Sequence, residues 1–327
     1  MADGSVRIGI LGAAGVARTA VIKPAKDNPE VEVVSVAARD VDRGRAYAAR
    51  HGIGTVHDSY EALIADPAVD AVYIPLPNAL HGKWIRAVLE AGKHVLVEKP
   101  FAANAAEARE LAALAAQSDR VVMEGLHHRY HPASVRIEQI LASGELGTIQ
   151  RVEAVNCYLL RDFAGSRYSY PLGGGATMDL GSYIVDTIRV YGGSTPEVVS
   201  AQAKIRGSQI DRVMTAELRF AEGHTGRLHC SMWSAEVPHY GTKVVGDRGE
   251  LRLHPLAPFQ RFSVRSADGR RDEKFPMRAT YAYQLDAFAG AVLRGEPVRT
   301  SAVDAVENMT IIDGIYRAAG LAVREPV

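Results

Sequence analysis

The first half of the chain alternates short apolar runs with stretches of helical period. Apolar runs of about four to eight residues are typical of buried parallel strands. The runs that predict strands are 6–11, 31–38, 55–56, 70–74, 94–97 and 121–123. Each is followed through a short loop by a stretch compatible with a helix, so the connections are expected to be right-handed crossovers. The pattern predicts an α/β fold, a doubly wound parallel sheet with helices on both faces.

Helix boundaries in this half follow from capping residues and stop signals. Asp58 precedes Glu61 with the spacing of a capping box, so a helix is expected to begin at Asp58. Asn104 is expected to cap an alanine-rich helix that continues to about Ser118. Two further helices are predicted over 40–51 and 79–91.

After about Glu124 the pattern changes. The helices predicted here are 132–143, 176–191, 282–294 and 302–319. The predicted strands are 148–160, 197–206, 212–220, 223–234, 239–246 and 250–253. Residues 213–220 alternate apolar and polar side chains, which indicates an antiparallel sheet with one covered face. We therefore predict a first domain over 1–124 and a second, α+β domain over 125–327 with a mainly antiparallel open sheet.

Composition narrows the function classes. The chain has 327 residues, enough for about two domains. Lys+Arg and Asp+Glu are both 38, so the basic excess of a nucleic-acid or anionic-membrane binder is lacking. Cys157 and Cys230 are too few for a disulfide framework or a four-thiolate zinc site. We expect a soluble cytoplasmic protein with a small-molecule substrate, and neither nucleic acid nor membrane as a partner.

The first βα turn is the candidate ligand loop. It reads Gly12-x-Ala14-x-x-Ala17, a variant of the G-x-G-x-x-G pattern in which small residues let backbone N–H groups approach a pyrophosphate. A tight turn without a ligand could use the same residues, but the position at the first turn of six β-α alternations favours a dinucleotide. The expected cofactor contacts come from Gly12, Ala13, Ala14, Gly15 and Val16.

The end of the second predicted strand indicates which dinucleotide is bound. An NAD site commonly has Asp or Glu there, for the ribose 2′-hydroxyl. This chain has Arg39 instead, with Arg43 one helical turn further on. A guanidinium suits a 2′-phosphate, so NADP(H) is favoured. Asp40 keeps NAD(H) possible, because a small loop shift could present its carboxylate.

Lys99 follows a buried strand and precedes Pro100, which puts an ammonium group at the carboxyl edge of the sheet. Such a lysine is either a surface residue or a participant in proton transfer and oxygen binding. Three histidines, His127, His128 and His131, lack the carboxylate or thiolate partners of a metal site, so no metal is expected. Arg129 beside them is a further candidate contact to cofactor or substrate.

Four motifs together resemble those of the glucose–fructose oxidoreductase/inositol dehydrogenase/MocA family. They are Gly12-x-Ala14-x-x-Ala17, Pro77-Asn78-x-x-His81, the 91–100 segment ending Glu98-Lys99-Pro100, and the 173–183 segment. The resemblance implies a nicotinamide-binding Rossmann domain over 1–124 and a substrate-binding domain over 125–327 whose open sheet forms a homodimer or homotetramer. It places Lys99 beside the nicotinamide, with a Lys99–Pro100 bond that is cis. The additional cofactor contacts that we expect are Leu76, Asn78, His81 and Glu98.

The segment 173–183 also has its own chemistry. Gly173–Gly175 lets backbone approach a ligand, and Asp179 and Tyr183 follow with a spacing that puts both on one helix face. Inositol-dehydrogenase-like members have histidine where this chain has Tyr183. The tyrosine, and Arg167 shortly before the glycines, resemble the branch that contains dihydrodiol dehydrogenase and nucleotide-sugar 3-ketoreductases. Lys99, Arg167, Asp179 and Tyr183 are therefore the predicted substrate-binding residues.

The predicted activity is hydride transfer between NADP(H) and a secondary alcohol or ketone of a sugar or similar polyhydroxylated molecule. Tyr183 is expected to exchange the proton, Lys99 to stabilise the reacting oxygen and Asp179 to orient a neighbouring group. This requires Lys99 and Tyr183 to converge around one oxygen. Two alternatives stay open: an NAD-dependent glycoside hydrolase of the same fold, and a nicotinamide-binding sensor without turnover.

Overall fold

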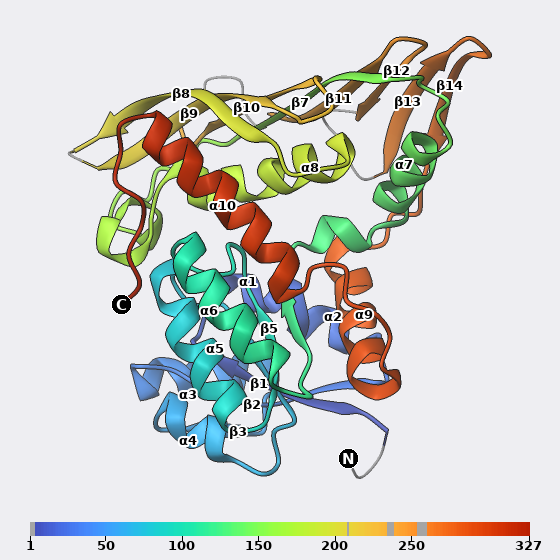
Figure 1. Ribbon diagram of the computed structural model, residues 1–327. Helices are drawn as coiled ribbons and strands as arrows, with labels where there is room; N and C mark the ends of the chain where they lie inside the picture. The colour runs from blue at the N-terminus through green and yellow to red at the C-terminus, as the bar shows by residue number, and fades with distance from the viewer. Residues whose placement is uncertain (1–3, 208, 234–238, 254–259) are drawn as a thin grey trace. The chain divides into compact units, whose positions relative to one another are not determined.

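A computed structural model describes residues 4–207, 209–233, 239–253 and 260–327. The chain divides into two compact units, each containing one β-sheet (Figure 1). The first unit consists of Met1–Tyr130, Arg278–Val306 and Pro326–Val327, and the second of His131–Met277 and Glu307–Glu325. Residues 278–306 thus group with the first unit, although they are remote from it in sequence. The functional ranges 1–124 and 125–327 stay a prediction.

The sheet of the first unit has the order β3-β2-β1-β4-β5-β6, and all its strand pairs are parallel. The strands are β1 (Val6–Leu11), β2 (Val31–Ala37), β3 (Thr55–His57), β4 (Ala71–Ile74), β5 (His94–Val97) and β6 (Val122–Glu124). The order reverses beside β1, which is the switch point of a doubly wound sheet. The carboxyl ends of β1 and β4 therefore flank the place where such sheets bind ligands.

Helices cover both faces of this sheet. On one face Val6, Ile8 and Ile10 share a core with the segment after β1 and with α9. On the other, Gly9 lies so close to Leu63 of α4 that an added Cβ would be 2.6 Å from its Cδ2. The helical segments are α1 (Gly15–Ala17), η1 (Arg18–Ile22), α2 (Lys23–Ala25), α3 (Val41–His51), α4 (Tyr60–Ala65), η2 (Asn78–Leu80), α5 (His81–Glu90), α6 (Ala105–Ala116), η3 (His127–Tyr130) and α9 (Thr280–Arg294).

The predicted helix caps have different outcomes. Asn104 caps α6, because its side chain accepts a hydrogen bond from Glu107 N, as predicted. The predicted start at Asp58 is wrong by one residue: Ser59 is the cap of α4 and accepts from Ala62 N at 3.0 Å. Serine and aspartate are both good capping residues, so the sequence alone does not decide which of these two adjacent residues is the cap.

The sheet of the second unit has the order β14-β13-β12-β11-β7-β10-β9-β8. Its strands are β7 (Ile149–Cys157), β8 (Glu197–Arg206), β9 (Ile210–Arg219), β10 (Thr225–Ser231), β11 (His239–Gly246), β12 (Glu250–Leu253), β13 (Arg261–Ser266) and β14 (Gly269–Lys274). Only the β7–β10 pair is parallel among the pairs described. β13 and β14 were not predicted. Ser234, the predicted end of the 223–234 strand, lies outside the described residues.

Helices α7 (Pro132–Ala142) and α8 (Ser182–Gly192) lie on one side of this sheet, and α8 contacts β7 and β10 (Figure 1). No described helix lies on the other side in that view. Val199 and Ile205 of β8 are 55% and 46% exposed. The predicted fold class, a doubly wound parallel sheet followed by a mainly antiparallel open sheet, is confirmed.

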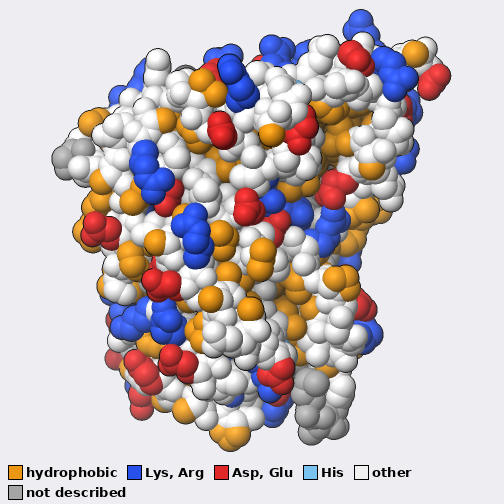
Figure 2. All heavy atoms as spheres, viewed as in Figure 1, with side chains coloured by type: hydrophobic (Ala, Val, Ile, Leu, Met, Phe, Trp, Pro, Cys, Tyr) orange, Lys and Arg blue, Asp and Glu red, His pale blue; other side chains and the backbone are white. Residues whose placement is uncertain are grey.

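The helix α10 (Ala302–Ala318) begins in the first unit and ends in the second. Within the described part of the chain, none of the helices has the length and apolarity needed to cross a membrane. Figure 2 shows side chains of both charge signs interspersed over the visible face, in agreement with the formal net charge of 0.

Candidate functional site

The loop after β1 has the geometry of a pyrophosphate cradle. Gly12 has φ +96°, and a Cβ there would lie 3.0 Å from Leu76 Cδ2. Its N–H donates to Ala37 O at 2.7 Å, which ties the start of the loop to the end of β2. A Cβ added to Gly15, in contrast, would meet no heavy atom of the described chain within 4 Å. The loop is thus closed at Gly12 and open at Gly15, where α1 begins, and this fits a phosphate group held by backbone N–H groups.

Two arginines stand beside this loop. Arg43 Nη2 donates to Ala13 O at 3.0 Å, and Arg39 is exposed directly after β2. Asp40 has another role, since its Oδ1 accepts from Arg43 N at 3.0 Å and caps α3. Burial raises the pKa of Tyr60, and Arg39 and Arg43 oppose that rise, which places both cations near this phenol.

The loops after β4 and β5 are tied together by His81. Its ring is fully buried, with Nδ1 2.7 Å from Pro100 O and Nε2 2.8 Å from Leu76 O. Burial lowers the pKa of His81 to about 4, although the hydrogen bonds to the two carbonyl groups oppose this, and the ring lies between the two loops. The Lys99–Pro100 bond is cis, as the resemblance implied. His81 thus holds the Leu76 and Pro100 segments; its contact with a cofactor stays a prediction.

Three other predicted residues line the same segments. Asn78 and Lys99 are half-buried, whereas Glu98 is 6% exposed. Glu98 Oε1 accepts from the Tyr73 hydroxyl at 2.7 Å. Glu98 is therefore fixed to the neighbouring strand β4, while Lys99 at the sheet edge retains partial exposure.

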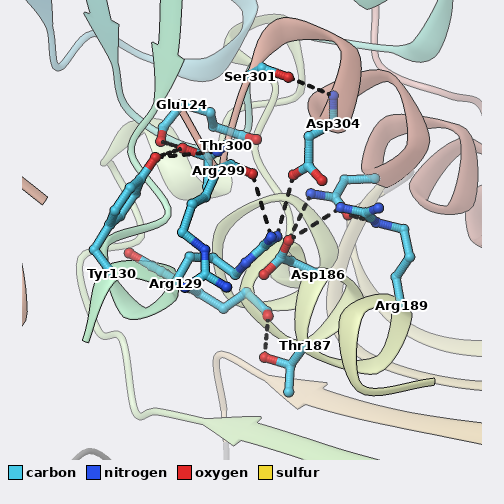
Figure 3. A network of polar contacts seen from close by, with 12 residues as sticks. Glu124, Arg129, Tyr130, Asp186, Thr187, Arg189, Arg299, Thr300, Ser301 and Asp304 are labelled. Atoms are coloured by element: carbon cyan, nitrogen blue, oxygen red, sulfur yellow. Dashed lines mark hydrogen bonds and ion pairs between the residues drawn. The ribbon is translucent and has the colours of Figure 1, made fainter. Parts of the chain in front are cut away.

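Arg129 is anchored to residues near the start of α10 (Figure 3). It is 8% exposed, with Nη1 3.4 Å from Asp304 Oδ2 and Nη2 3.4 Å from Arg299 O. Thr300 links the same region to β6, because its Oγ1 donates to Glu124 O at 2.7 Å. These bonds attach Arg129 to the first unit; its predicted contact with a ligand stays a prediction.

The nearby histidines have packing and capping roles. His127 packs on Tyr281 with ring centroids 4.0 Å apart, and His131 Nδ1 accepts from Ala133 N at 3.1 Å as the cap of α7. Over the described residues, no group of three or more His, Cys, Asp or Glu side chains has the geometry of a metal site.

In the second unit three predicted residues come together. Arg167 in η4 (Ser166–Tyr168) and Asp179 form an ion pair with Nε–Oδ2 2.7 Å. The Asp179 carboxylate raises the pKa of Arg167, and Tyr183 acts in the same direction. Tyr183, in the first turn of α8, is half-buried. The arrangement is a phenol beside a cation–carboxylate pair, which is suited to proton exchange with a bound oxygen.

The helix that carries Asp179 and Tyr183 is not uniformly α-helical. Residues of η6 (Thr177–Gly181) form a π-helical turn before α8, whereas a continuous helix over 176–191 was predicted. Asn156 of β7 donates from Nδ2 to Leu180 O at 2.9 Å, which satisfies a carbonyl in that turn. Such turns are frequent at functional sites. Asn156 was missed, because β7 also contains Gln150, Arg151 and Glu153 and one more polar residue in it gives no signal.

The predicted residues therefore form two groups. One surrounds the Gly12 loop and Lys99 in the first unit, and the other contains Arg167, Asp179 and Tyr183 in the second. The convergence of Lys99 and Tyr183 stays a prediction.

Comparison with known proteins identifies the family. Residues 6–126 match the GFO/IDH/MocA oxidoreductase family with an NAD-binding Rossmann fold, and residues 134–252 match the GFO/IDH/MocA C-terminal domain. D-xylose 1-dehydrogenase (NADP(+)) 2 of Haloferax volcanii is 36% identical, over 95% of this chain and 96% of that protein. The chain belongs to the GFO/IDH/MocA family.

Other members of the GFO/IDH/MocA family are similar to this chain at lower sequence identity or over a shorter part of its length. A 3-ketoreductase from Actinomadura kijaniata, solved with NADP and TDP-benzene, superposes with a TM-score of 0.88 at 28% identity, covering 96% of this chain and 98% of that one. Trans-1,2-dihydrobenzene-1,2-diol dehydrogenase of Bos taurus is 35% identical over 68% of this chain and 66% of that protein. The predictions of the family, of an oxidoreductase and of a nicotinamide cofactor are confirmed at this level.

Proposed function

We propose that this GFO/IDH/MocA member is an NADP(H)-dependent oxidoreductase acting on a secondary alcohol or ketone of a sugar or similar polyhydroxylated molecule. One observation carries the choice of NADP(H). The carboxylate that could have bound a ribose 2′-hydroxyl, Asp40, caps α3, while Arg43 donates to Ala13 O in the Gly12 loop and Arg39 lies near Tyr60. Guanidinium groups bind a 2′-phosphate with charge-assisted hydrogen bonds.

The cradle determines how the cofactor would be held. Backbone N–H groups of the loop Gly12–Val16 would bind the pyrophosphate, and Arg39 the adenosine phosphate. When bound, the nicotinamide supplies or accepts the hydride. Leu76, packed against Gly12, limits how deeply a ligand enters the loop.

The remaining chemistry belongs to side chains of this chain. In reduction, Tyr183 gives its proton to the developing alkoxide, and Lys99 provides positive charge to that oxygen. Asp179 holds Arg167 near the phenol, so that a cation lies beside the group that exchanges the proton. Arg167 and Asp179 are the residues that would also bind substrate hydroxyl groups.

The substrate class and the assembly are proposed from the named relatives and from the surface of the second sheet. Relatives named for xylose and for TDP-sugar derivatives support a sugar as substrate. The exposed apolar residues Val199 and Ile205 of β8 support a homodimer or homotetramer formed through this sheet.

The test is a coupled binding and turnover screen. The protein is titrated with NADPH and NADH, and aldoses, ketosugars and their glycosides are then screened for a change in nicotinamide absorbance. We expect tighter binding of NADPH and absorbance change with at least one free sugar. Release of sugar from a glycoside without net absorbance change would instead indicate the hydrolase. Binding of cofactor with no product in any assay would indicate a sensor.

A further inference from the structure

A buried ion pair joins the last residues of the chain to the large sheet. Arg324 Nη2 lies 2.8 Å from Asp211 Oδ1, and both side chains are 0% exposed. The other residues of 321–327 are exposed or half-exposed. Burying a charged guanidinium costs free energy unless its N–H donors are paired. The hydrogen-bond partners of Arg324 therefore indicate its role.

Those partners belong to several separate segments. Arg324 Nε donates to Gly174 O at 2.8 Å, Nη1 to Ala322 O at 3.1 Å and Nη2 to Gln209 O at 3.2 Å. The guanidinium also lies over the Tyr316 and Tyr170 rings, at 4.2 and 4.9 Å from their centroids. The planar fork therefore connects the glycine-rich segment with β9, a geometry that an ammonium group cannot reproduce.

Asp211 continues this connection to the helix of the site. Its Oδ2 accepts from Thr177 N at 2.7 Å and from Thr177 Oγ1 at 2.6 Å, at the first residue of η6. Its Oδ1 also accepts from the Tyr316 hydroxyl at 3.1 Å. The ion pair thus holds Gly174 through one partner and the start of the helix with Asp179 through the other.

The segment between these two points has no room to adjust. Gly175 N donates to Arg167 O at 2.9 Å, and a Cβ on Gly174 would lie 2.6 Å from that same oxygen. Gly175 has φ +130°, and a Cβ there would lie 2.1 Å from Asp211 Oδ1. A shift of Gly174 is therefore transmitted to the backbone of Arg167, whose side chain pairs with Asp179.

We propose that Arg324 is a positioning residue for the reaction. Through Gly174 O and Asp211 it fixes the backbone of Arg167 relative to the helix that carries Asp179 and Tyr183. This proposal rests on the proposed function, in which Tyr183 exchanges the proton. The proposal gives residues 321–327 a role in activity, although none of them is among the candidate site residues.

The test compares Arg324→Lys, which keeps the charge but loses the fork, with Arg317→Lys. Arg317 is a matched control, because it lies nearby in sequence, its side chain is exposed, and it pairs with Asp313 at 3.3 Å outside the segment 167–183. For Arg324→Lys we expect kcat to fall by roughly tenfold or more, since small misplacements of reacting groups are costly. NADPH affinity should stay within about twofold, and Arg317→Lys should match wild type.

A second readout does not depend on turnover. The Tyr183 pKa is obtained by ultraviolet titration, as the difference between each protein and its Tyr183→Phe counterpart. Displacing Arg167 moves a cation away from the phenol, so Arg324→Lys should raise this pKa. A lower melting temperature with unchanged kcat and unchanged Tyr183 pKa would show that Arg324 only anchors the tail.

Thr177→Val keeps the proposal testable if Arg324→Lys does not fold. It deletes one hydrogen bond of the connection, from Thr177 Oγ1 to Asp211 Oδ2 at 2.6 Å, and nearly keeps the shape of the side chain. A smaller change in the same direction in kcat and Tyr183 pKa is expected, and no change would overturn the proposal. If wild type turned over no sugar, the proposed function would fail, while the titration would still decide on positioning.

Discussion

The two groups of candidate residues are built differently. Around the Gly12 loop, the proposed binding groups are backbone N–H groups and the exposed side chains of Arg39 and Arg43. In the second unit, Asp179 is 12% exposed and paired with Arg167, and the fully buried pair Asp211–Arg324 lies behind the same segment. Exposed cations can be changed with little loss of stability, whereas truncating one partner of a buried pair leaves an uncompensated charge. Binding and chemistry should therefore be separable by mutation.

The largest effect is expected from Tyr183→Phe. This change removes the proposed proton donor, so kcat should fall roughly 10²-fold or more, as is usual when general acid–base catalysis is lost. The dissociation constant of NADPH should be unchanged, because the cradle lies in the first unit. Steady-state turnover on the screened substrate and fluorescence titration with NADPH are the measurements.

Tyr158→Phe is the control for that experiment, since Tyr158 belongs to the same unit and is 40% exposed. It should behave as wild type. Equal turnover of Tyr183→Phe and wild type would remove the tyrosine from the mechanism.

The next largest effect is expected from Arg39→Ala. Losing a charge-assisted contact to the 2′-phosphate should weaken NADPH binding roughly 10- to 100-fold and leave NADH binding nearly unchanged. Arg45→Ala is the matched control, because Arg45 is an exposed residue of α3 paired with Asp42 at 2.9 Å. Isothermal titration with both cofactors measures the ratio. Similar losses for NADPH and NADH would mean that Arg39 does not contact the phosphate.

The strands that could be predicted from the sequence are those with a clear local pattern. The strands Val6–Leu11 and His94–Val97 were predicted with their observed bounds, because both are apolar runs with clear stops. β14 was missed because the run Gly269–Lys274 is almost entirely charged, and its pairing with β13 comes from the tertiary structure. Propensity cannot show such tertiary pairing.

In the candidate site, too, the residues with a local pattern were predicted and those that depend on distant packing were not. Arg167, Asp179 and Tyr183 were found from local spacing and from a family resemblance, and the ion pair of the first two agrees with their grouping. Asp211 and Arg324 were not found, since they are 113 positions apart and neither lies in a motif. Local pattern identifies groups that face a ligand, whereas the groups behind them depend on the packing of distant segments.

Gly12 and Gly15, in the same loop, allow an effect on stability to be separated from an effect on cofactor binding. Gly12→Ala forces a side chain into φ +96° and toward Leu76, so it should cost about 1–2 kcal/mol of unfolding free energy as well as weaken binding. Gly15→Ala adds a methyl group where the described chain leaves space, so its stability should be that of wild type. Its NADPH affinity should still fall roughly tenfold if the pyrophosphate is held at Gly15 as proposed. Urea unfolding and NADPH titration separate the two effects, and a destabilised Gly15→Ala would contradict an open cradle.

Acid pH should perturb the second unit mildly while the arginines of the first stay charged. His131 is fully buried, and burial lowers its pKa to about 4, in keeping with Nδ1 acting as an acceptor for Ala133 N. The unfolded chain takes up this proton near pH 6.5 and the folded chain only near pH 4, so the stabilisation is complete above pH 6.5 and is lost as pH falls toward 4. Between about pH 7.5 and 5.5, protonation of this histidine in the unfolded chain should lower the free energy of unfolding by about 1 kcal/mol.

The test is His131→Asn, which keeps a capping acceptor but has no titrating group. The free energy of unfolding, measured with urea at both pH values, should decrease in the wild type by about 1 kcal/mol more than in His131→Asn. Equal losses in both proteins would show that the ring of His131 already accepts a proton in the folded state.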